Sequence, residues 1–202
     1  MQPRQAHDSV DRPRPGEPTL FVISGTQGAG KSTVARLLAE RFERGAWVSA
    51  DHLQRMIVAG GRWPEGGEMS PEAERQLRLR LKHACLLAAS FVEAGISAVI
   101  DDIVIGDRVE HLLEELAGRR FVFVMLTPRL EVVRAREAGR GTRLWGRWEW
   151  LDDVVRTRTR RLGLWIDNSD QAPEQTVDEI LRRARNEGLV GVPDRYAEQT
   201  GC

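Results

Sequence analysis

The segment from Gly25 to Ser32 constrains this chain more than any other feature. It reads Gly-Thr-Gln-Gly-Ala-Gly-Lys-Ser, the pattern G-x-x-x-x-G-K-S, and it lies between a strand-like run at 19–24 and a helix-like run that begins at Thr33. Glycines at this spacing let backbone N–H groups curl around phosphate oxygens, and the N-terminus of the following helix adds positive potential. The segment therefore predicts a loop that binds the phosphates of ATP or a related nucleotide.

Two side chains of the motif have chemical roles of their own. Lys31 is predicted to reach the β and γ oxygens of ATP, and Ser32 to offer its hydroxyl to Mg²⁺. Only Lys31 and Lys82 are lysines among 30 basic residues, so the motif lysine is not a sample from a lysine-rich surface. The alternative is an accidental glycine turn before a helix. We expect nucleotide contacts from Gly25, Thr26, Gln27, Gly28, Ala29, Gly30, Lys31, Ser32 and Thr33.

Short apolar runs alternate with longer amphipathic ones along the chain. The apolar runs, which we interpret as buried strands, lie at 20–24, 46–49, 98–100, 121–126 and 164–166. The amphipathic runs, which we interpret as helices, lie at 33–44, 51–58, 71–94, 107–117, 128–138, 149–162 and 174–187. Such alternation implies a parallel sheet covered by helices on both faces. We therefore predict an α/β fold of three layers, α/β/α, with a five-stranded parallel sheet.

Length, composition and charge limit the classes of protein that fit. A chain of 202 residues that is 41% hydrophobic suits one domain with one sizeable core. The formal net charge is zero, so no whole-molecule field attracts nucleic acid or an anionic membrane. No apolar run approaches the roughly 20 residues that span a bilayer, and two cysteines form neither a disulfide framework nor a zinc pattern. We expect a cytoplasmic protein.

The two ends of the chain differ in composition from the middle. Residues 1–18 hold four of the nine prolines among mixed charges, a composition that does not bury enough apolar surface to order itself. Residues 188–202 look similar. We predict flexible tails at 1–18 and 188–202, with one domain at 19–187.

Acidic residues follow two of the predicted strands, at the sheet edge where ligands of open parallel sheets bind. Asp101 and Asp102 come directly after the strand at 98–100, which is how enzymes of phosphoryl transfer hold Mg²⁺ or its water shell. Only one of them should face the metal, because successive side chains of a strand alternate between faces. The sequence does not decide which one, and an ordinary turn at the strand end is the alternative.

Asp51 follows the strand at 46–49 and has two interpretations. A carboxylate at this strand end is able to accept the proton of an attacking hydroxyl, so Asp51 is a candidate general base. The alternative is an N-cap for the helix that continues from Leu53. His83 and His111 are expected on helix surfaces.

The stretch from Arg134 to Arg161 is markedly basic, with nine arginines and four acids. Arginine matches phosphate oxygens, and charge that builds on a transferred phosphoryl group needs donors that a closing lid brings over it. We predict a lid at about 136–150 with Arg136 and Arg140 as its phosphate contacts, against the alternative of a solvated helix face. The tryptophans that we expect either to stack on a substrate or to anchor the lid are Trp63, Trp145, Trp148 and Trp150.

These residues together resemble a family, the P-loop small-molecule kinases, and within it the chloramphenicol phosphotransferases. The resemblance runs from about residue 19 to 181 and is most specific at 48–53 (Val-Ser-Ala-Asp-His-Leu), 99–104 (Val-Ile-Asp-Asp-Ile-Val) and 136–143 (Arg-Glu-Ala-Gly-Arg-Gly-Thr-Arg). It implies the P-loop kinase fold and an ATP-dependent transfer to a hydroxyl. The roles that it implies are Asp51 as base, Ser32 on Mg²⁺, and Lys31, Arg136 and Arg140 on the transferred phosphoryl group.

Three functions remain open at this point. The first is a kinase that phosphorylates a hydroxyl of a small molecule such as an antibiotic, with Arg55, Trp63 and Asp102 as substrate contacts. The second is a nucleic-acid or nucleotide 5′-hydroxyl kinase, because polynucleotide 5′-kinase domains are similar in placing an aspartate and then an arginine after the second strand, as Asp51 and Arg55 are placed here. The third is a nucleotide-binding switch without catalysis.

Overall fold

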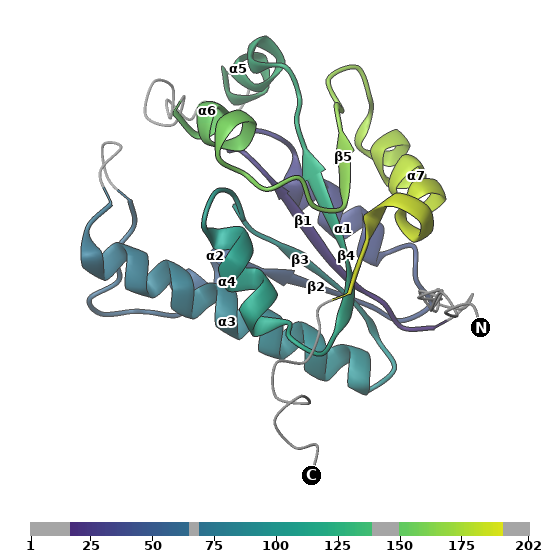
Figure 1. Cartoon of the computed structure of the whole chain (residues 1–202), viewed down its shortest axis with the longest axis horizontal. Helices are drawn as coiled ribbons and strands as arrows, with labels where there is room; N and C mark the ends of the chain where they lie inside the picture. The colour runs from purple at the N-terminus through teal and green to yellow at the C-terminus, as the bar shows by residue number, and fades with distance from the viewer. Residues whose placement is uncertain (1–16, 65–68, 139–149, 192–202) are drawn as a thin grey trace, which may run out of the picture.

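The chain folds around one twisted sheet with helices on both faces (Figure 1). The computed structural model describes residues 17–64, 69–138 and 150–191. Five strands pair in parallel in the order β2-β3-β1-β4-β5. Their bounds are β1 Leu20–Gly25, β2 Gly45–Ser49, β3 Ser97–Asp101, β4 Arg120–Leu126 and β5 Leu164–Ile166. The predicted five-stranded parallel sheet is confirmed.

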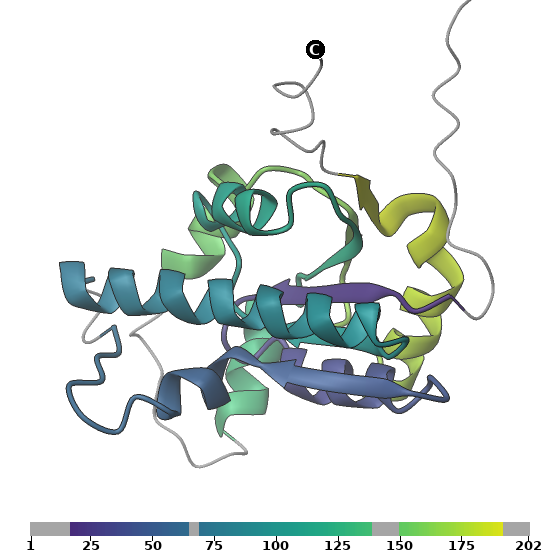
Figure 2. The ribbon, with the colours of Figure 1, turned by 90° about the horizontal axis from the view of Figure 1, so that it is seen from below.

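Helices connect successive strands and form the two outer layers. Their bounds are α1 Lys31–Ala39, α2 Ala50–Arg55, α3 Pro71–Glu93, α4 Arg108–Glu115, α5 Leu130–Ala138, α6 Trp150–Thr157 and α7 Pro173–Arg183. One hydrophobic core packs α3, α4 and α6 on one face of the sheet, and a second packs α1 and α7 on the other. Figure 2 shows α3 running lengthwise along the sheet. The three-layer prediction is therefore confirmed.

Alternation along β1 produces the two cores. Leu20 and Val22 pack toward the face of α3, whereas Phe21 and Ile23 pack toward α1. A strand that is buried on both faces carries apolar side chains on both of them, so its sequence is a continuous apolar run. Because the strands are held in the core, the residues that directly follow each strand have fixed positions.

A short sixth strand extends the fold beyond the predicted domain boundary at residue 187. After α7 the chain makes a π-helical turn, Ala184–Gly188, and then β6, Leu189–Gly191, pairs antiparallel with the start of β4. Val190 is buried in the core. Only Leu189 and Val190 are apolar between Gly188 and Gly191, so the sequence pattern missed this strand. The boundary at 187 is therefore too early, and residues 192–202, like 1–16, lie outside the described residues.

The long helix α3 has clear start and stop signals in its sequence. Ser70 caps its first turn by accepting a hydrogen bond from the Ala73 N–H at 3.1 Å, and Pro71 occupies the first helical position. Gly95, with φ of 79°, follows its end. Within the described residues no helix is long and apolar enough to cross a membrane.

Cys85 on α3 provides a test of this packing. Its side chain is buried, and burial raises the pKa of its thiol well above the usual range. Because the thiolate is the reactive form, we expect Cys85 in a Cys202→Ser variant to resist iodoacetamide in the native protein and to react fully once unfolded in urea. Mass spectrometry of both samples measures this. Equal labelling rates in the two samples would mean that α3 does not pack this thiol into the core.

Candidate active site

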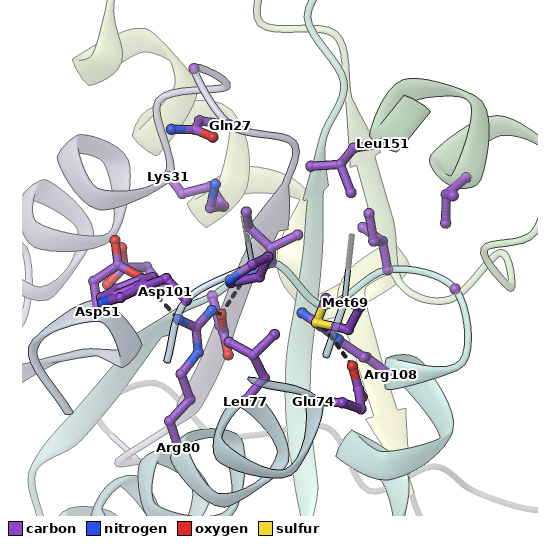
Figure 3. A pocket seen from close by; sticks show the side chains of 18 of the residues that line it. Gln27, Lys31, Asp51, Met69, Glu74, Leu77, Arg80, Asp101, Arg108 and Leu151 are labelled. Carbon is purple, nitrogen blue, oxygen red and sulfur yellow. Dashed lines mark hydrogen bonds and ion pairs between the residues drawn. The ribbon is translucent and has the colours of Figure 1, made fainter. Parts of the chain in front are cut away.

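A cavity of 990 Å³ opens at the carboxyl ends of the parallel strands (Figure 3). The phosphate loop forms one side, and α2, α3, α4 and α6 contribute the others. The predicted site residues that line it are Gln27, Gly28, Gly30, Lys31, Ser32, Thr33, Asp51, Arg55, Trp63, Asp101, Asp102 and Trp150. Residues that are far apart in the sequence thus meet at one edge of the sheet, as the order of strands requires.

The phosphate loop has the backbone shape that its glycines permit. Gly28 and Gly30 adopt φ of 76° and 92°, and α1 begins at Lys31 directly after them. The Lys31 ammonium donates to the Thr26 carbonyl oxygen at 2.9 Å. Burial lowers the pKa of Lys31, and the nearby carboxylates of Asp101, Asp102 and Asp51 oppose that shift. A desolvated cation beside a helix N-terminus is a strong site for phosphate oxygens.

Gly25, where β1 passes into this loop, tolerates no side chain. Its φ is 146°, and a Cβ there would lie 2.6 Å from the Leu126 carbonyl oxygen. We expect Gly25→Ala to lower the free energy of unfolding by several kcal/mol, since unfavourable φ and overpacking each cost about 1–3 kcal/mol. Gly60→Ala is the matched control, because Gly60 also has positive φ (70°) but open space around it. Urea unfolding of both variants measures the difference, and equal losses would contradict the close approach.

Asp101 is the aspartate that lies beside the phosphate loop. Its carboxylate accepts hydrogen bonds from the Ser32 hydroxyl at 2.5 Å and from the Trp47 indole N–H at 2.8 Å. Burial raises the pKa of Asp101, and these two hydrogen bonds oppose the shift. The position of Trp47 inside a strand predicts core packing. It packs partly against the core and, in addition, holds this carboxylate.

The pair of Ser32 and Asp101 suits a magnesium ion. An alcohol and a carboxylate supply the hard oxygen ligands that Mg²⁺ prefers, and Mg²⁺ in nucleotide sites takes only one or two protein ligands besides phosphates and water. In the described part of the chain, no group of three or more acidic, histidine or cysteine side chains gathers as a metal site would require without a nucleotide. The donor set therefore fits Mg²⁺ that arrives with ATP.

Asp102 points to a different neighbour. It is buried, and its carboxylate accepts hydrogen bonds from the Ile103 N–H at 2.7 Å and from the Arg80 guanidinium. The other terminal nitrogen of Arg80 lies 3.3 Å from an Asp51 oxygen. Sequence reasoning missed Arg80. Its position three residues after Leu77 and four before Ala84 is a usable signal, because it places an arginine on the apolar face of α3.

Asp51 lies inside a short helix rather than at its cap. Helix α2 begins at Ala50, and Ser49 occupies the N-cap position. The side chain of Asp51 is 58% exposed and lines the cavity. The N-cap interpretation of Asp51 therefore does not describe this helix, and its carboxylate is accessible to a molecule in the cavity.

The predicted lid residues divide into one that is described and one that is not. Arg136 donates to the Asn168 carbonyl oxygen at 2.9 Å, and a side chain at Gly30 would come within 4.0 Å of its guanidinium. Asn168 in turn donates to the Ala29 carbonyl oxygen at 3.1 Å. Arg136 therefore lies over the phosphate loop. Arg140, Trp145 and Trp148 lie outside the described residues.

The part of the cavity between α3, α4 and α6 combines apolar walls with a few polar groups. Leu77, Leu151 and Val154 line it, and Arg108 pairs with Glu74 at 3.2 Å. His111 lines it too, with Nδ1 buried and without a hydrogen-bond partner in the described structure. The expectation that His111 lies on a helix surface is thus wrong, because the face of α4 that carries it turns toward the cavity.

Solved structures with this fold include several kinases. The APS kinase of Mycobacterium tuberculosis, in complex with AMPPNP and APS, superposes with a TM-score of 0.60 at 16% identity, covering 83% of this chain and 98% of the other. A gluconokinase from Sinorhizobium meliloti gives 0.59 at 19%, covering 84% and 95%. The shikimate kinase of Acinetobacter baumannii, in complex with shikimate, gives 0.55 at 19%, covering 82% and 91%. The predicted P-loop kinase fold is confirmed.

The sequence matches a family model, which is more specific than the likeness in fold. No curated protein sequence matches the chain. The model for the chloramphenicol phosphotransferase-like proteins matches residues 18–185, which is nearly all of the described domain. This chain therefore belongs to the chloramphenicol phosphotransferase-like protein family and is an ATP-dependent kinase of the P-loop class.

Proposed function

We propose that this protein transfers the γ-phosphoryl group of Mg·ATP to a hydroxyl group of a small molecule. The observation that carries the proposal is the single cavity that Lys31, Asp51 and Asp101 line together. Phosphoryl transfer needs positioning and charge neutralisation above all. A cation, a metal-binding edge and an accessible carboxylate around one cavity supply these requirements.

The nucleotide end of the cavity would be formed by residues of the loop. Gly25, Thr26, Gln27, Gly28, Ala29, Gly30, Lys31, Ser32 and Thr33 would hold the phosphates of ATP, and Ser32 with Asp101 would hold Mg²⁺. When bound, the metal neutralises phosphate charge. Lys31 and Arg136 would donate to the transferred phosphoryl group, the role that we also propose for Arg140.

Asp51 would accept the proton of the acceptor's hydroxyl. Its carboxylate is exposed to the cavity and lies close enough to Lys31 to influence that residue electrostatically. A base next to the phosphate end is the arrangement that transfer to a hydroxyl requires. Arg55 and Trp63, which line the same region, would contact the acceptor.

The acceptor end favours a small molecule over a nucleic acid. Its walls include the apolar side chains of Leu77, Leu151 and Val154 beside the arginines, of which Arg108 is paired with Glu74. Nucleic-acid sites instead depend mainly on basic groups that face a phosphate backbone. The structures with this fold include kinases bound to small acceptors, APS and shikimate. An antibiotic acceptor is proposed on family membership alone.

A substrate panel tests the proposal. ADP release from Mg·ATP is measured with hydroxylated antibiotics, nucleosides, sugars and short 5′-hydroxyl oligonucleotides, with Asp51→Asn as the control. We expect one class of small molecules to stimulate the wild type and not the control. Stimulation by oligonucleotides that falls steeply with salt would favour the polynucleotide kinase instead. Tight ATP binding with no stimulation by any compound would favour a nucleotide-binding switch.

A further inference from the structure

Arg80 is a buried charge that the proposed function does not yet use. It lies in the middle of α3 and is only 5% exposed, although arginine is rarely buried unless it is paired. Figure 3 shows it rising from α3 toward Asp51, with Leu77 beside it. Its two terminal nitrogens contact two different carboxylates, those of Asp51 and Asp102. One side chain therefore joins the ends of two strands.

We propose that Arg80 is the positioning residue of this site, which holds Asp51 where it accepts the proton of the acceptor. The proposal rests on the proposed function, because it assigns Arg80 a role through Asp51. Arg80 is not proposed to contact the phosphoryl group. It fixes the distance between the base on α2 and the sheet that carries the phosphate loop.

The contact with Asp102 anchors the guanidinium to the sheet. Asp102 follows β3, is 6% exposed, and is fixed by the Ile103 N–H as well as by Arg80. A charged pair that is buried on both sides is held tightly, because breaking it would leave an uncompensated charge in the interior. The position of Arg80 is consequently as well defined as that of the strand end.

The contact with Asp51 links this fixed position to a more exposed part of the site. Asp51 is largely exposed and belongs to a helix of six residues, which alone would hold a carboxylate loosely. The Arg80 nitrogen at 3.3 Å is its hydrogen-bond donor in the described structure. The planar fork of arginine presents a separate nitrogen to each carboxylate, whereas lysine would have to bring its one nitrogen to both.

The third donor of Arg80 and its aromatic neighbour indicate that this ion pair is more than structural. The Nε atom is buried and has no hydrogen-bond partner in the described structure, which is costly in a purely structural pair. The guanidinium carbon lies 5.7 Å from the centroid of the Trp63 ring. Arg80 therefore lies over the Trp63 ring and has two nitrogens on the carboxylates of the site.

Trp63 is itself held by α3, one turn before Arg80. Gln76 accepts a hydrogen bond from the Arg62 N–H at 2.7 Å and donates to the Gly60 carbonyl oxygen at 2.9 Å. Gln54, on α2, donates both to Gln76 at 2.9 Å and to the Arg62 carbonyl oxygen at 3.0 Å. Two buried glutamines thus tie the loop before Trp63 to the helix that carries Arg80.

The test measures whether Arg80 acts through Asp51. ADP formation is followed with the acceptor that stimulates most in the panel above, or with water as acceptor if none stimulates. We expect Arg80→Lys and Arg80→Met to lower kcat by about 10²-fold, the effect of misplacing a reacting group by about 1 Å. The Kd of Mg·ATP should stay within about twofold, because Arg80 does not contact the phosphate loop. Arg78→Met, an exposed arginine on the same helix, is the matched control and should equal the wild type.

The double variant Asp51→Asn with Arg80→Met distinguishes positioning from other roles. If Arg80 acts through Asp51, the double variant loses no more rate than Asp51→Asn alone. Losses that multiply would overturn the proposal, and so would a wild-type rate in a folded Arg80→Met. A wild-type rate in Asp51→Asn would contradict the proposed function itself, and the role of Arg80 with it.

A second pair of variants separates rate from stability. Arg80→Met leaves Asp102 buried without its cation, so this variant alone should be less stable. Arg80→Met with Asp102→Leu replaces both partners by apolar groups of similar shape, which should recover thermal stability. We expect the rate to remain about 10²-fold below the wild type in this double variant. Recovery of the rate together with the stability would mean that Arg80 has only a structural role.

Discussion

Replacing Lys31 by alanine is expected to lower the rate of phosphoryl transfer by at least about 10³-fold. Lys31 is a buried cation at the N-terminus of α1, with the carboxylates of Asp51, Asp101 and Asp102 in its electrostatic surroundings. Without it, the phosphates of ATP would lack the cation that offsets the negative charge of these carboxylates. ADP formation at saturating Mg·ATP measures the rate, and isothermal titration measures the accompanying loss of ATP affinity.

Lys82→Ala is the matched control for this variant. Lys82 is the other lysine of the chain and lies exposed on α3, away from the cavity lining. We expect it to retain wild-type activity, and we expect both variants to unfold in urea like the wild type, since Lys31 makes its hydrogen bond to a carbonyl of a loop. A rate for Lys31→Ala within tenfold of the wild type would refute the placement of the phosphates.

Replacing Asp51 by asparagine is expected to lower the rate by about 10²–10⁴-fold, the usual contribution of a general base. The amide keeps the size of the side chain and removes its proton affinity. The affinity for Mg·ATP should be unchanged, because Asp51 lies on α2 and outside the phosphate loop. Titration of ATP together with kcat at saturating Mg·ATP tests this, since kcat should fall while the affinity for Mg·ATP stays the same.

Asp178→Asn controls for loss of a surface carboxylate. Asp178 is exposed on α7 and pairs only with Arg41 in the described structure, a surface pair of little energetic weight. It should behave as the wild type. An Asp51→Asn variant that fails to bind ATP would instead identify Asp51 as a nucleotide or metal contact.

The sheet and the residues at its edge were predictable because strand position fixes them. Apolar runs and glycine turns locate the five parallel strands, and the rule that ligands bind at carboxyl ends selects Asp51, Asp101 and Asp102. Alternation along β3 predicts that Asp101 and Asp102 diverge. The structure places Asp101 beside Ser32 and Asp102 beside Arg80.

The residues that helices contribute to the cavity were not predictable in the same way. Helix periodicity shows that Arg80 shares the face of Leu77 and Leu81, but it does not say which turn of α3 lies beside the strand ends. The same holds for His111 on α4, whose neighbours in the cavity come from α3 and α6. Tertiary packing alone decides which turns of these helices reach the site.

Trp47 has two roles, and the sequence predicts only one of them. Its position in β2 predicts core packing, and it does pack partly against the core. Its indole N–H, however, reaches Asp101 on the neighbouring strand, because β2 and β3 pair in parallel with Ser49 opposite Asp101. Strand order, which the sequence does not give, was needed to see this contact.

The central claim is that this cavity transfers a phosphoryl group from ATP to a hydroxyl. The most direct measurement is phosphorus NMR of the wild type with Mg·ATP and the acceptor that stimulates most in the panel. We expect ADP and a phosphate monoester of the acceptor to appear in equal amounts. We expect Lys31→Ala to form neither product faster than the background. Inorganic phosphate in place of the ester, or no turnover with any acceptor, would contradict it.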